Sequence, residues 1–142
     1  MTKTFFKTIL FFSVLIGIGY SQFQTPVTVS AVSDNSTRPG EVTYIQVEAQ
    51  MDDEWHIYAL ENAGEGPVAS RIKVSGDIVQ EQGLIEHREP TEKFDEGFGV
   101  KTRFFKGSTV FRVPVKIKEN APVGKTDLSV YMLYQGCYES LC

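Results

Sequence analysis

The chain of 142 residues has only two cysteines, Cys137 and Cys142, and both lie among its last six residues. So few cysteines exclude a disulfide-rich scaffold, in which several bridges take the place of a large hydrophobic core. Basic charge is also scarce, because 14 Lys and Arg stand against 18 Asp and Glu, which gives a net charge of −4. A nucleic-acid-binding domain normally carries a basic patch, so the composition argues against that class of function.

Helical periodicity is missing as well, except in a segment of different character at the N-terminus. There, two lysines accompany a largely apolar run over residues 9–19, and the small residues Gly19 and Ser21 follow it. The run is short for a membrane-spanning helix, which needs about 20 apolar residues. The pattern predicts a secretory signal peptide over residues 1–21, with an uncleaved membrane anchor as the alternative. Export would place the mature chain outside the cytoplasm, where disulfides form and persist.

Short segments of alternating apolar and polar residues fill most of the chain after the signal peptide, separated by turns rich in Gly, Pro, Asn and Asp. In one of them, Ile45, Val47 and Ala49 share a face, as expected of a strand with one side in the core. The pattern predicts an all-β, immunoglobulin-like β-sandwich as a single domain over residues 22–142. The expected strands are 27–31, 42–49, 55–60, 70–76, 108–117 and 128–134.

Two segments fit this pattern less well. Pro114 cannot donate a hydrogen bond to a neighbouring strand, so we expect the strand 108–117 to lie at a sheet edge or at a bulge. Residues 80–99 are polar and charged with little periodicity. We expect them to form a long loop or an irregular hairpin.

The cysteine pair has a structural and a chemical interpretation. A structural disulfide in a sandwich would be expected between distant strands, as in antibody domains. Cys137 and Cys142 instead close a loop that, in the chain-entropy model, adds only about 2 kcal/mol of stability. A short-loop disulfide beside an exposed turn is more often reachable by another thiol, and access is one requirement for thiol–disulfide exchange. Spacing alone leaves both interpretations open.

The segment YQGCYESLC, residues 134–142, resembles the active-site segment of the N-terminal periplasmic domain of the thiol:disulfide interchange protein DsbD. In the best-known members of that family the two cysteines are one residue further apart. The resemblance implies that Cys137 and Cys142 are catalytic and shuttle between dithiol and disulfide without any bound cofactor. It also implies thioredoxin-like extracytoplasmic partners, such as a disulfide isomerase or a cytochrome c maturation factor.

The segment DEGFG, Asp95 to Gly99, is similar to the cap loop of that family, in which an acidic pair and aromatic rings cover the disulfide until a partner arrives. Gly97 stands where the family has an aromatic residue directly after the acidic pair. The shielding ring would therefore come from Phe98 or Phe94. The resemblance thus implies a cap made of Asp95, Glu96, Phe98 and Phe94.

The segment DEWHIY, residues 53–58, resembles a family segment whose tyrosines lie near the cysteines. Tyr58 matches one of them, and His56 stands where the family has a second tyrosine. Tyr134, within the cysteine segment itself, is also expected near the active site.

The family domain continues past its second cysteine into another strand, and membrane helices and a thioredoxin-like domain follow in full-length members. This sequence stops at Cys142. We therefore expect it to be the N-terminal part of a longer membrane protein with an electron relay, and its sandwich to lack the last strand and to have an open edge.

Two other classes of function stay open from the residues. One is a non-catalytic β-sandwich binding or adhesion module with an inert disulfide. The other is a small metal carrier, in which the two thiolates would bind a soft ion such as copper(I). A further set, His56 and His87 with Asp53, Glu86 and Glu89, has no recognised ligand spacing, so we expect no metal there.

Overall fold

The computed structural model describes residues 25–33, 36–61, 66–139 and 141–142. The signal peptide expected over residues 1–21 lies outside the described residues and stays a prediction. In the described part of the chain the secondary structure is entirely β, which confirms the expected fold class. The strands are β1 (Val27–Ser33), β2 (Val42–Met51), β3 (Trp55–Tyr58), β4 (Arg71–Ser75), β5 (Val79–Gln82), β6 (Thr91–Asp95), β7 (Val100–Lys106), β8 (Ser108–Ile117), β9 (Ser129–Leu133) and β10 (Gly136–Tyr138).

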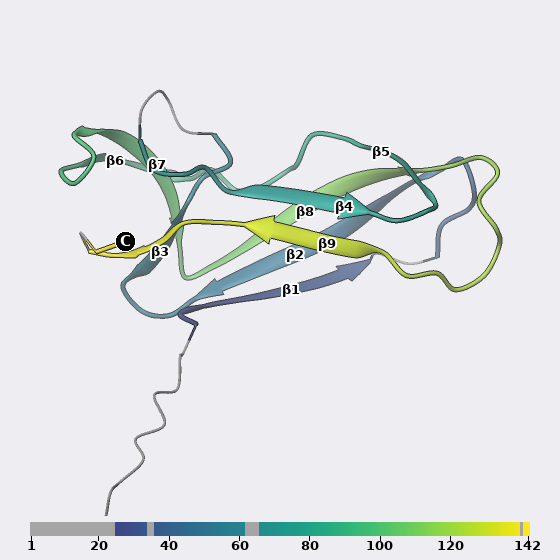
Figure 1. Cartoon of the computed structure of the whole chain (residues 1–142), viewed down its shortest axis with the longest axis horizontal. Coiled ribbons are helices and arrows are strands. Elements are labelled where there is room, and N and C mark those ends of the chain that lie inside the picture. Colours follow the sequence, from purple (N-terminus) through teal and green to yellow (C-terminus); the bar gives the residue numbers. More distant parts are fainter. Residues whose placement is uncertain (1–24, 34–35, 62–65, 140) are drawn as a thin grey trace, which may run out of the picture.

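Three antiparallel sheets build an immunoglobulin-like sandwich (Figure 1). The long sheet has the order β1-β2-β8-β5, and the short sheet pairs β4 with β9. The end sheet has the order β10-β3-β7-β6 and lies at the end of the molecule where the chain terminates (Figure 1). Cys137, which lies in β10, and Cys142 are therefore found at one end of the sandwich, beside the β6–β7 hairpin.

The core lies between these sheets and follows the alternation of β2 and β8. Val47 pairs with Phe111 and Ile45 pairs with Val113, and all four side chains are buried. Ala49, the third residue expected on this face, is buried too. Burying one large aliphatic or aromatic side chain contributes about 1.5–3 kcal/mol, so this interface is a main source of stability.

The edge position expected for the strand with Pro114 is wrong, because β8 lies between β2 and β5. The proline is accommodated where the pairing with β5 stops. Its carbonyl accepts a hydrogen bond from Gly83 N at 2.9 Å, directly after β5 ends. The register with β5 also shifts between Val79 and Glu81, so the expectation of an irregular ladder near this proline is confirmed.

The segment 80–99 is more regular than expected. It contains the end of β5 and all of β6, and β6 pairs in register with β7, from Thr91 opposite Phe104 to Asp95 opposite Val100. We predicted no strand at β7. The sequence pattern did not reveal this hairpin, because β6 lies at the edge of its sheet and nearly all its side chains are exposed. Such a strand needs no apolar face, so its apolar and polar residues need not alternate.

The open edge expected from a missing last strand stays a prediction, because each of the three sheets has edge strands. Among the described residues β9 pairs with β4 alone, so its other edge has no strand beside it. The inner face of β1 is also incompletely covered, since Val29 pairs with the buried Ala49 and is itself 38% exposed. Whether a further strand pairs with β9 stays a prediction. No helix of sufficient length and hydropathy to cross a membrane occurs in the part of the chain that the structure describes.

Candidate active site

Cys137 and Cys142 form a disulfide with their Cα atoms 4.2 Å apart. Cys137 lies in β10, and Cys142 follows a tight turn in which Tyr138 and Leu141 exchange backbone hydrogen bonds of 2.8 Å. Glu139 takes a left-handed conformation with φ of 50° in this turn. The turn reverses the chain and brings the second sulfur back beside the first.

The two cysteines differ sharply in exposure. Cys137 is 0% exposed, whereas Cys142 is exposed. The hydroxyl of Tyr58 lies 4.0 Å from Cys142 Sγ, and the side-chain amide of Gln135 lies 4.0 Å from Cys137 Sγ. Thiol–disulfide exchange requires access to a sulfur, and of the two cysteines Cys142 is the accessible one in this structure.

Gln135 is a site residue that the sequence analysis missed. Its Nε2 points to Cys137, its Oε1 accepts a hydrogen bond from Val68 N at 2.7 Å, and its carbonyl accepts one from Tyr58 N at 3.4 Å. A neutral glutamine carries no charge or periodicity by which to find it, and its only signal is its place in the segment YQGC. Tyr134, which was expected near the cysteines, packs against the hydrophobic core.

Asp95 connects the β6–β7 turn to β3. Its Oδ1 accepts hydrogen bonds from the backbone N–H groups of Gly97 at 3.0 Å and Phe98 at 3.3 Å. Its Oδ2 accepts a hydrogen bond from the Tyr58 hydroxyl at 2.8 Å. Gly99 closes the turn with φ of 68°, a conformation that glycine adopts without steric cost. The turn is therefore tied to the tyrosine that touches Cys142.

The expected cap residues take different positions around this turn. The ring of Phe98 packs edge-on against Tyr58, with 6.0 Å between the ring centroids. Phe94 is 55% exposed and lines a neighbouring cleft together with Glu96. The structure thus brings Asp95, Phe98 and Tyr58 together beside Cys142, and Phe94 and Glu96 lie to one side.

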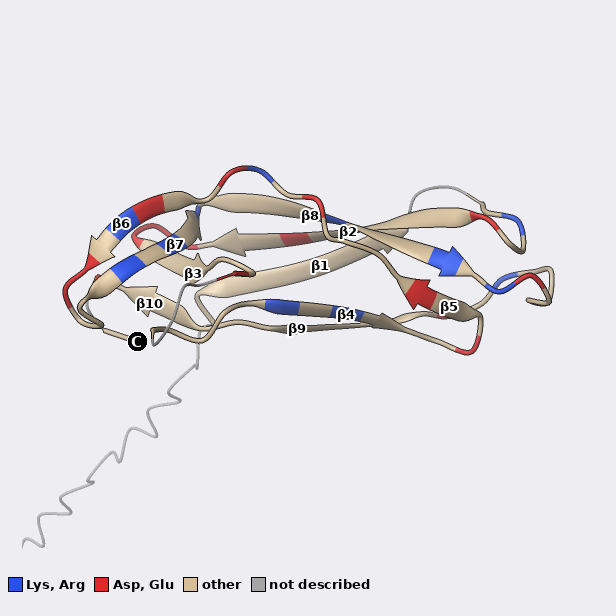
Figure 2. Cartoon of the chain, turned by 90° about the horizontal axis from the view of Figure 1, so that it is seen from above, with Lys and Arg blue, Asp and Glu red and all other residues tan. Residues whose placement is uncertain are grey.

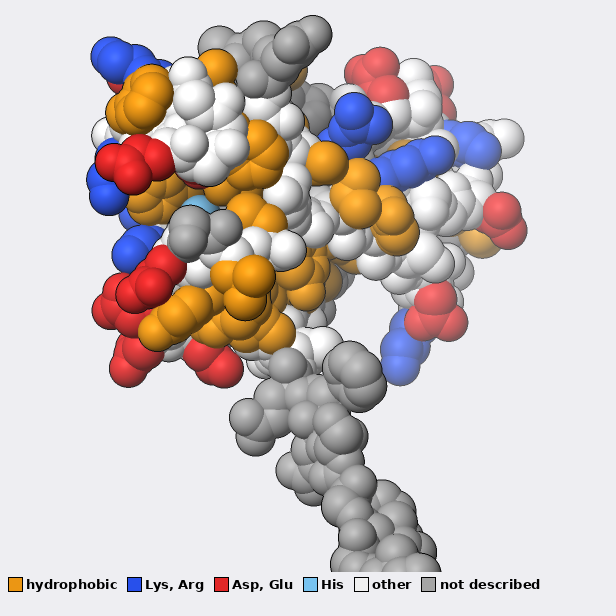
Figure 3. Space-filling model, turned by 60° about the vertical axis from the view of Figure 1, so that its left-hand side comes forward, with side chains coloured by type: hydrophobic (Ala, Val, Ile, Leu, Met, Phe, Trp, Pro, Cys, Tyr) orange, Lys and Arg blue, Asp and Glu red, His pale blue; other side chains and the backbone are white. Residues whose placement is uncertain are grey.

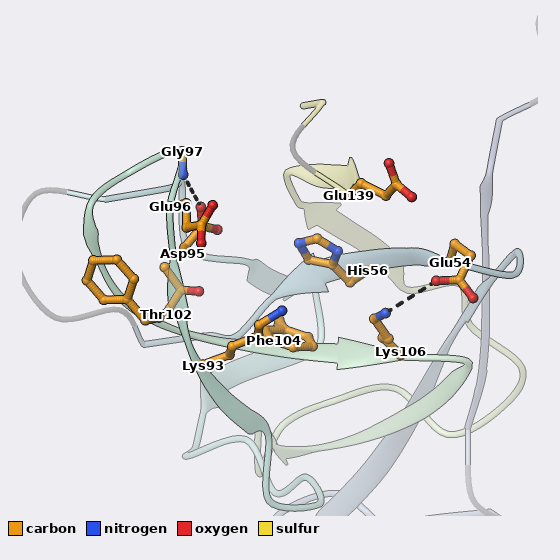
Figure 4. Close-up of a pocket in the computed structure, with 11 residues that line it drawn as sticks. Glu54, His56, Lys93, Asp95, Glu96, Gly97, Thr102, Phe104, Lys106 and Glu139 are labelled. Carbon is orange, nitrogen blue, oxygen red and sulfur yellow. Dashed lines mark hydrogen bonds and ion pairs between the residues drawn. The ribbon is translucent and has the colours of Figure 1, made fainter.

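That cleft has a volume of about 380 Å³ and lies between β3, the β6–β7 hairpin and the turn after β10 (Figure 4). His56 lies in it, only 8% exposed, with its ring 5.2 Å from that of Tyr58 and 5.0 Å from that of Phe104. Charges of both signs surround the cleft, and Figure 2 shows them on β6 and on its turn to β7. The charged residues that line it are Glu54, Lys93, Asp95, Glu96, Lys106 and Glu139.

The surroundings shift the pKa values of the His56 imidazole and the Tyr58 hydroxyl. Burial lowers the pKa of His56 from 6.5, the positive charges of Lys106 and Lys93 lower it further, and Asp95 opposes them in part. Burial raises the pKa of Tyr58 from its ordinary value of 10, and its hydrogen bond to Asp95 and the charge of that carboxylate add to the effect. At neutral pH the imidazole is therefore uncharged, and the tyrosine keeps its proton as a hydrogen-bond donor.

Exposed apolar side chains gather around the disulfide. Tyr138 is 38% exposed and Leu141 is 71% exposed in the turn after β10, and the rings of Phe98 and Phe94 are exposed on the β6–β7 hairpin. Trp55 packs against Tyr138 with 5.9 Å between the ring centroids. Figure 3 shows hydrophobic side chains on this end of the molecule, with acidic side chains beside them. Exposed apolar patches bordered by polar residues commonly mark surfaces that bind other proteins.

The histidines and acidic residues considered as metal ligands do not form one cluster. The ring of His87 lies against those of Phe105 and Phe111, and His56 lies in the cleft. Within the described ranges, no three side chains of His, Cys, Asp or Glu are grouped in a way that could hold a metal ion.

Comparison with known proteins identifies the family. The profile of the family described as thiol:disulfide interchange protein DsbD, N-terminal, matches residues 23–142. The fold is similar to that of the N-terminal periplasmic domain of ScsB from Proteus mirabilis, with a TM-score of 0.61 and 22% identity over 82% of this chain and 42% of that one. The reduced N-terminal domain of Neisseria meningitidis DsbD matches with a TM-score of 0.45 and 21% identity over 67% of this chain and 63% of that one.

The chain thus spans less than half of the ScsB structure and less than two thirds of the DsbD structure. No curated protein matches the chain. At 22% identity the ScsB structure supports the fold alone, and the family assignment depends on the profile, which covers nearly all of the sequence after the predicted signal peptide. The chain belongs to the family of DsbD N-terminal domains, which are thiol–disulfide exchange domains.

Proposed function

We propose that residues 22–142 form a periplasmic module that passes reducing equivalents from the dithiol of Cys137 and Cys142 to disulfides in partner proteins. The observation that carries this proposal is the unequal exposure of the pair. Cys142 is exposed at an apolar surface, and Cys137 is buried directly beneath it. That arrangement suits a reaction in which one sulfur meets the partner and the other completes the exchange.

The reaction needs no bound cofactor, because the two sulfurs carry the electrons. The thiolate of Cys142 attacks one sulfur of the partner disulfide, and the other partner sulfur leaves as a thiolate. The thiolate of Cys137 then attacks the Cys142 sulfur of the mixed disulfide and releases the second partner sulfur. Two electrons pass to the partner, and the disulfide seen in the structure forms again.

The cap explains how the pair is protected between encounters. With the hairpin turn closed, Phe98 packs on Tyr58 and Tyr58 contacts Cys142, so small reagents approach from fewer directions. A partner that binds the apolar side chains at this end would displace the Phe98 ring. We propose that the partners are thioredoxin-like proteins, such as a disulfide isomerase or a cytochrome c maturation factor.

The cellular setting follows from the same proposal. Residues 1–21 would direct export as a signal peptide, and a membrane-embedded relay domain would return electrons to the pair after each exchange. The pair would then alternate between dithiol and disulfide in the periplasm.

The reduction potential of the pair tests the proposal. The mature domain is equilibrated in a graded series of thiol/disulfide buffers, free thiols are alkylated, and the products are weighed by mass spectrometry. A potential well above about −300 mV is expected of an exchangeable pair. A potential below that value, or thiols that never react in the folded protein, would instead indicate a structural disulfide and favour a binding or adhesion module.

A trapping experiment tests the order of attack. The Cys137→Ser variant keeps the exposed Cys142 and should accumulate a mixed disulfide with an oxidised thioredoxin-like protein. The matched Cys142→Ser variant keeps only the buried Cys137 and should trap far less. Equal trapping by both variants would contradict the assigned order.

A further inference from the structure

The second step of exchange poses a chemical problem at Cys137. Its side chain is 0% exposed, and the thiol must lose a proton before it can attack the mixed disulfide. A thiol in apolar surroundings forms its thiolate less readily than one in water. A proton acceptor within the protein would remove this obstacle.

His56 lies where such an acceptor is needed. It is the register partner of Cys137 in the antiparallel pairing of β10 with β3. Directly opposed residues project from the same face of a sheet, with Cβ atoms about 4.5–5.5 Å apart. Tyr58 follows two residues later on the same face and contacts Cys142. One face of the end sheet therefore carries Cys137, His56 and Tyr58, and Cys142 lies beside Tyr58.

We propose that His56 accepts the proton of the Cys137 thiol when Cys137 closes the disulfide, and so makes the second step of exchange pH-dependent. The inference rests on the proposed function and deepens it. Two neighbouring groups are poorer acceptors, because Asp95 already accepts hydrogen bonds from Tyr58 and two backbone amides, and Tyr58 remains protonated.

The charges around His56 suit a neutral imidazole that gains a proton only briefly. Lys106 on β7 and Lys93 on β6 face the cleft and disfavour the imidazolium, while Asp95 favours it. Acidic side chains on three neighbouring elements also line the cleft: Glu54 before β3, Glu96 after β6 and Glu139 after β10. Glu54 lies 3.9 Å from Lys106 and offsets part of that positive charge. Figure 4 shows the imidazole in the cleft between these groups.

The proton and electron balance of the step is complete. The Cys137 proton passes to an imidazole nitrogen, and the resulting thiolate forms a bond to Cys142 Sγ. The bond between Cys142 and the partner sulfur breaks, and the partner sulfur leaves as a thiolate. That thiolate takes a proton from the imidazolium, which returns His56 to its neutral form.

A small aromatic disulfide, 5,5′-dithiobis(2-nitrobenzoate), separates the two steps. Reaction of the fully reduced domain releases one coloured thiolate when Cys142 attacks and a second when Cys137 closes the ring. The first phase depends on reagent concentration and the second does not. Stopped-flow absorbance at a series of pH values measures both rates in the same trace.

The His56→Phe variant should slow the second phase at least about tenfold near pH 7, because a positioned general base typically contributes about 10²–10⁴-fold to the rate of a step that transfers a proton. The first phase should stay unchanged. In the unaltered domain the second rate should rise through the titration of His56, at a pH below 6.5, and then level off before the thiol itself titrates. His87→Phe is the control, because His87 also contacts two aromatic rings but is exposed and does not line the cleft, so its replacement should affect neither phase.

His56→Gln provides a second variant in case the phenylalanine disturbs packing, and the pH profile of the unaltered domain needs no variant at all. An unchanged second phase in the folded variants, or a wild-type profile without the inflection below pH 6.5, would overturn the role of His56. Neither result would contradict the exchange proposal, which is tested separately by the reduction potential of the pair and by the release of the second thiolate in this assay.

Discussion

Replacing Phe98 with alanine should open the disulfide to small reductants. Phe98 is 37% exposed, so about two thirds of its surface is covered, mainly where its ring packs on Tyr58. Full burial of a phenylalanine contributes about 1.5–3 kcal/mol, and the covered share therefore amounts to about 1–2 kcal/mol. If the closed cap loses this much stabilising free energy, the fraction of molecules with an open cap increases by about 5–30-fold. If reduction requires an open cap, its rate should rise by the same factor.

The assay mixes the oxidised domain with excess small dithiol, stops the reaction with acid at successive times, and counts alkylated cysteines by mass. Phe94→Ala is the matched control. Phe94 is 55% exposed and lines the cleft to one side, so its removal should change the rate by less than about twofold, in line with other surface substitutions. Unchanged reduction of the Phe98→Ala variant, or equal acceleration by both variants, would refute the reasoning that this ring is the shield.

Three further predictions concern the same end of the molecule. Tyr58→Phe removes the hydrogen bond to Asp95 and should lower the free energy of unfolding by about 1.5–3 kcal/mol in urea titrations, since the acceptor is charged. Glu139 has φ of 50°, so Glu139→Gly should be more stable than Glu139→Ala by about 1 kcal/mol in the same titration; equal stability would mean that the turn is unstrained. The pKa of His56 is lowered on folding, so the unfolded chain binds more protons below pH 6.5, and stability should fall as the pH drops below that value. Urea midpoints between pH 7.5 and 5 would show this fall, and a His56→Phe variant should lose it.

Much of the fold could be predicted because the core strands have one buried and one exposed face. In β2, Ile45, Val47 and Ala49 alternate with less buried neighbours, and the structure buries all three. The alternation of apolar and polar residues arises from burial of one face, so it cannot identify a strand that has no buried face. The β6–β7 hairpin is such a case, and the polar sequence around Phe94 concealed a regular ladder. The edge position expected for the strand with Pro114 was wrong for a related reason. A proline removes one hydrogen-bond donor, but the strand that contains it can still pair with a neighbour on that side.

The site was predictable only in its cysteines and in the segments that resemble a known family. Gln135 and the position of His56 beside Cys137 depend on the register between β3 and β10, which are separated by almost the whole domain. A register shift of one residue would turn His56 to the other face of the sheet. No local pattern specifies this pairing.

The position of the two cysteines on either side of a tight turn has a physical consequence for exchange. Cys137 is held in the ladder with β3, whereas Cys142 follows the turn and lies outside that ladder. Among the described residues Cys142 belongs to no strand pair, so when the bond opens its sulfur is less constrained than that of Cys137, which stays in the ladder. The five-residue separation keeps the two sulfurs at a high effective concentration, so closure outcompetes a second partner molecule. A disulfide between two distant core strands would hold both sulfurs in ladders and would lack this freedom. The short loop that adds little stability is therefore well suited to opening and closing repeatedly.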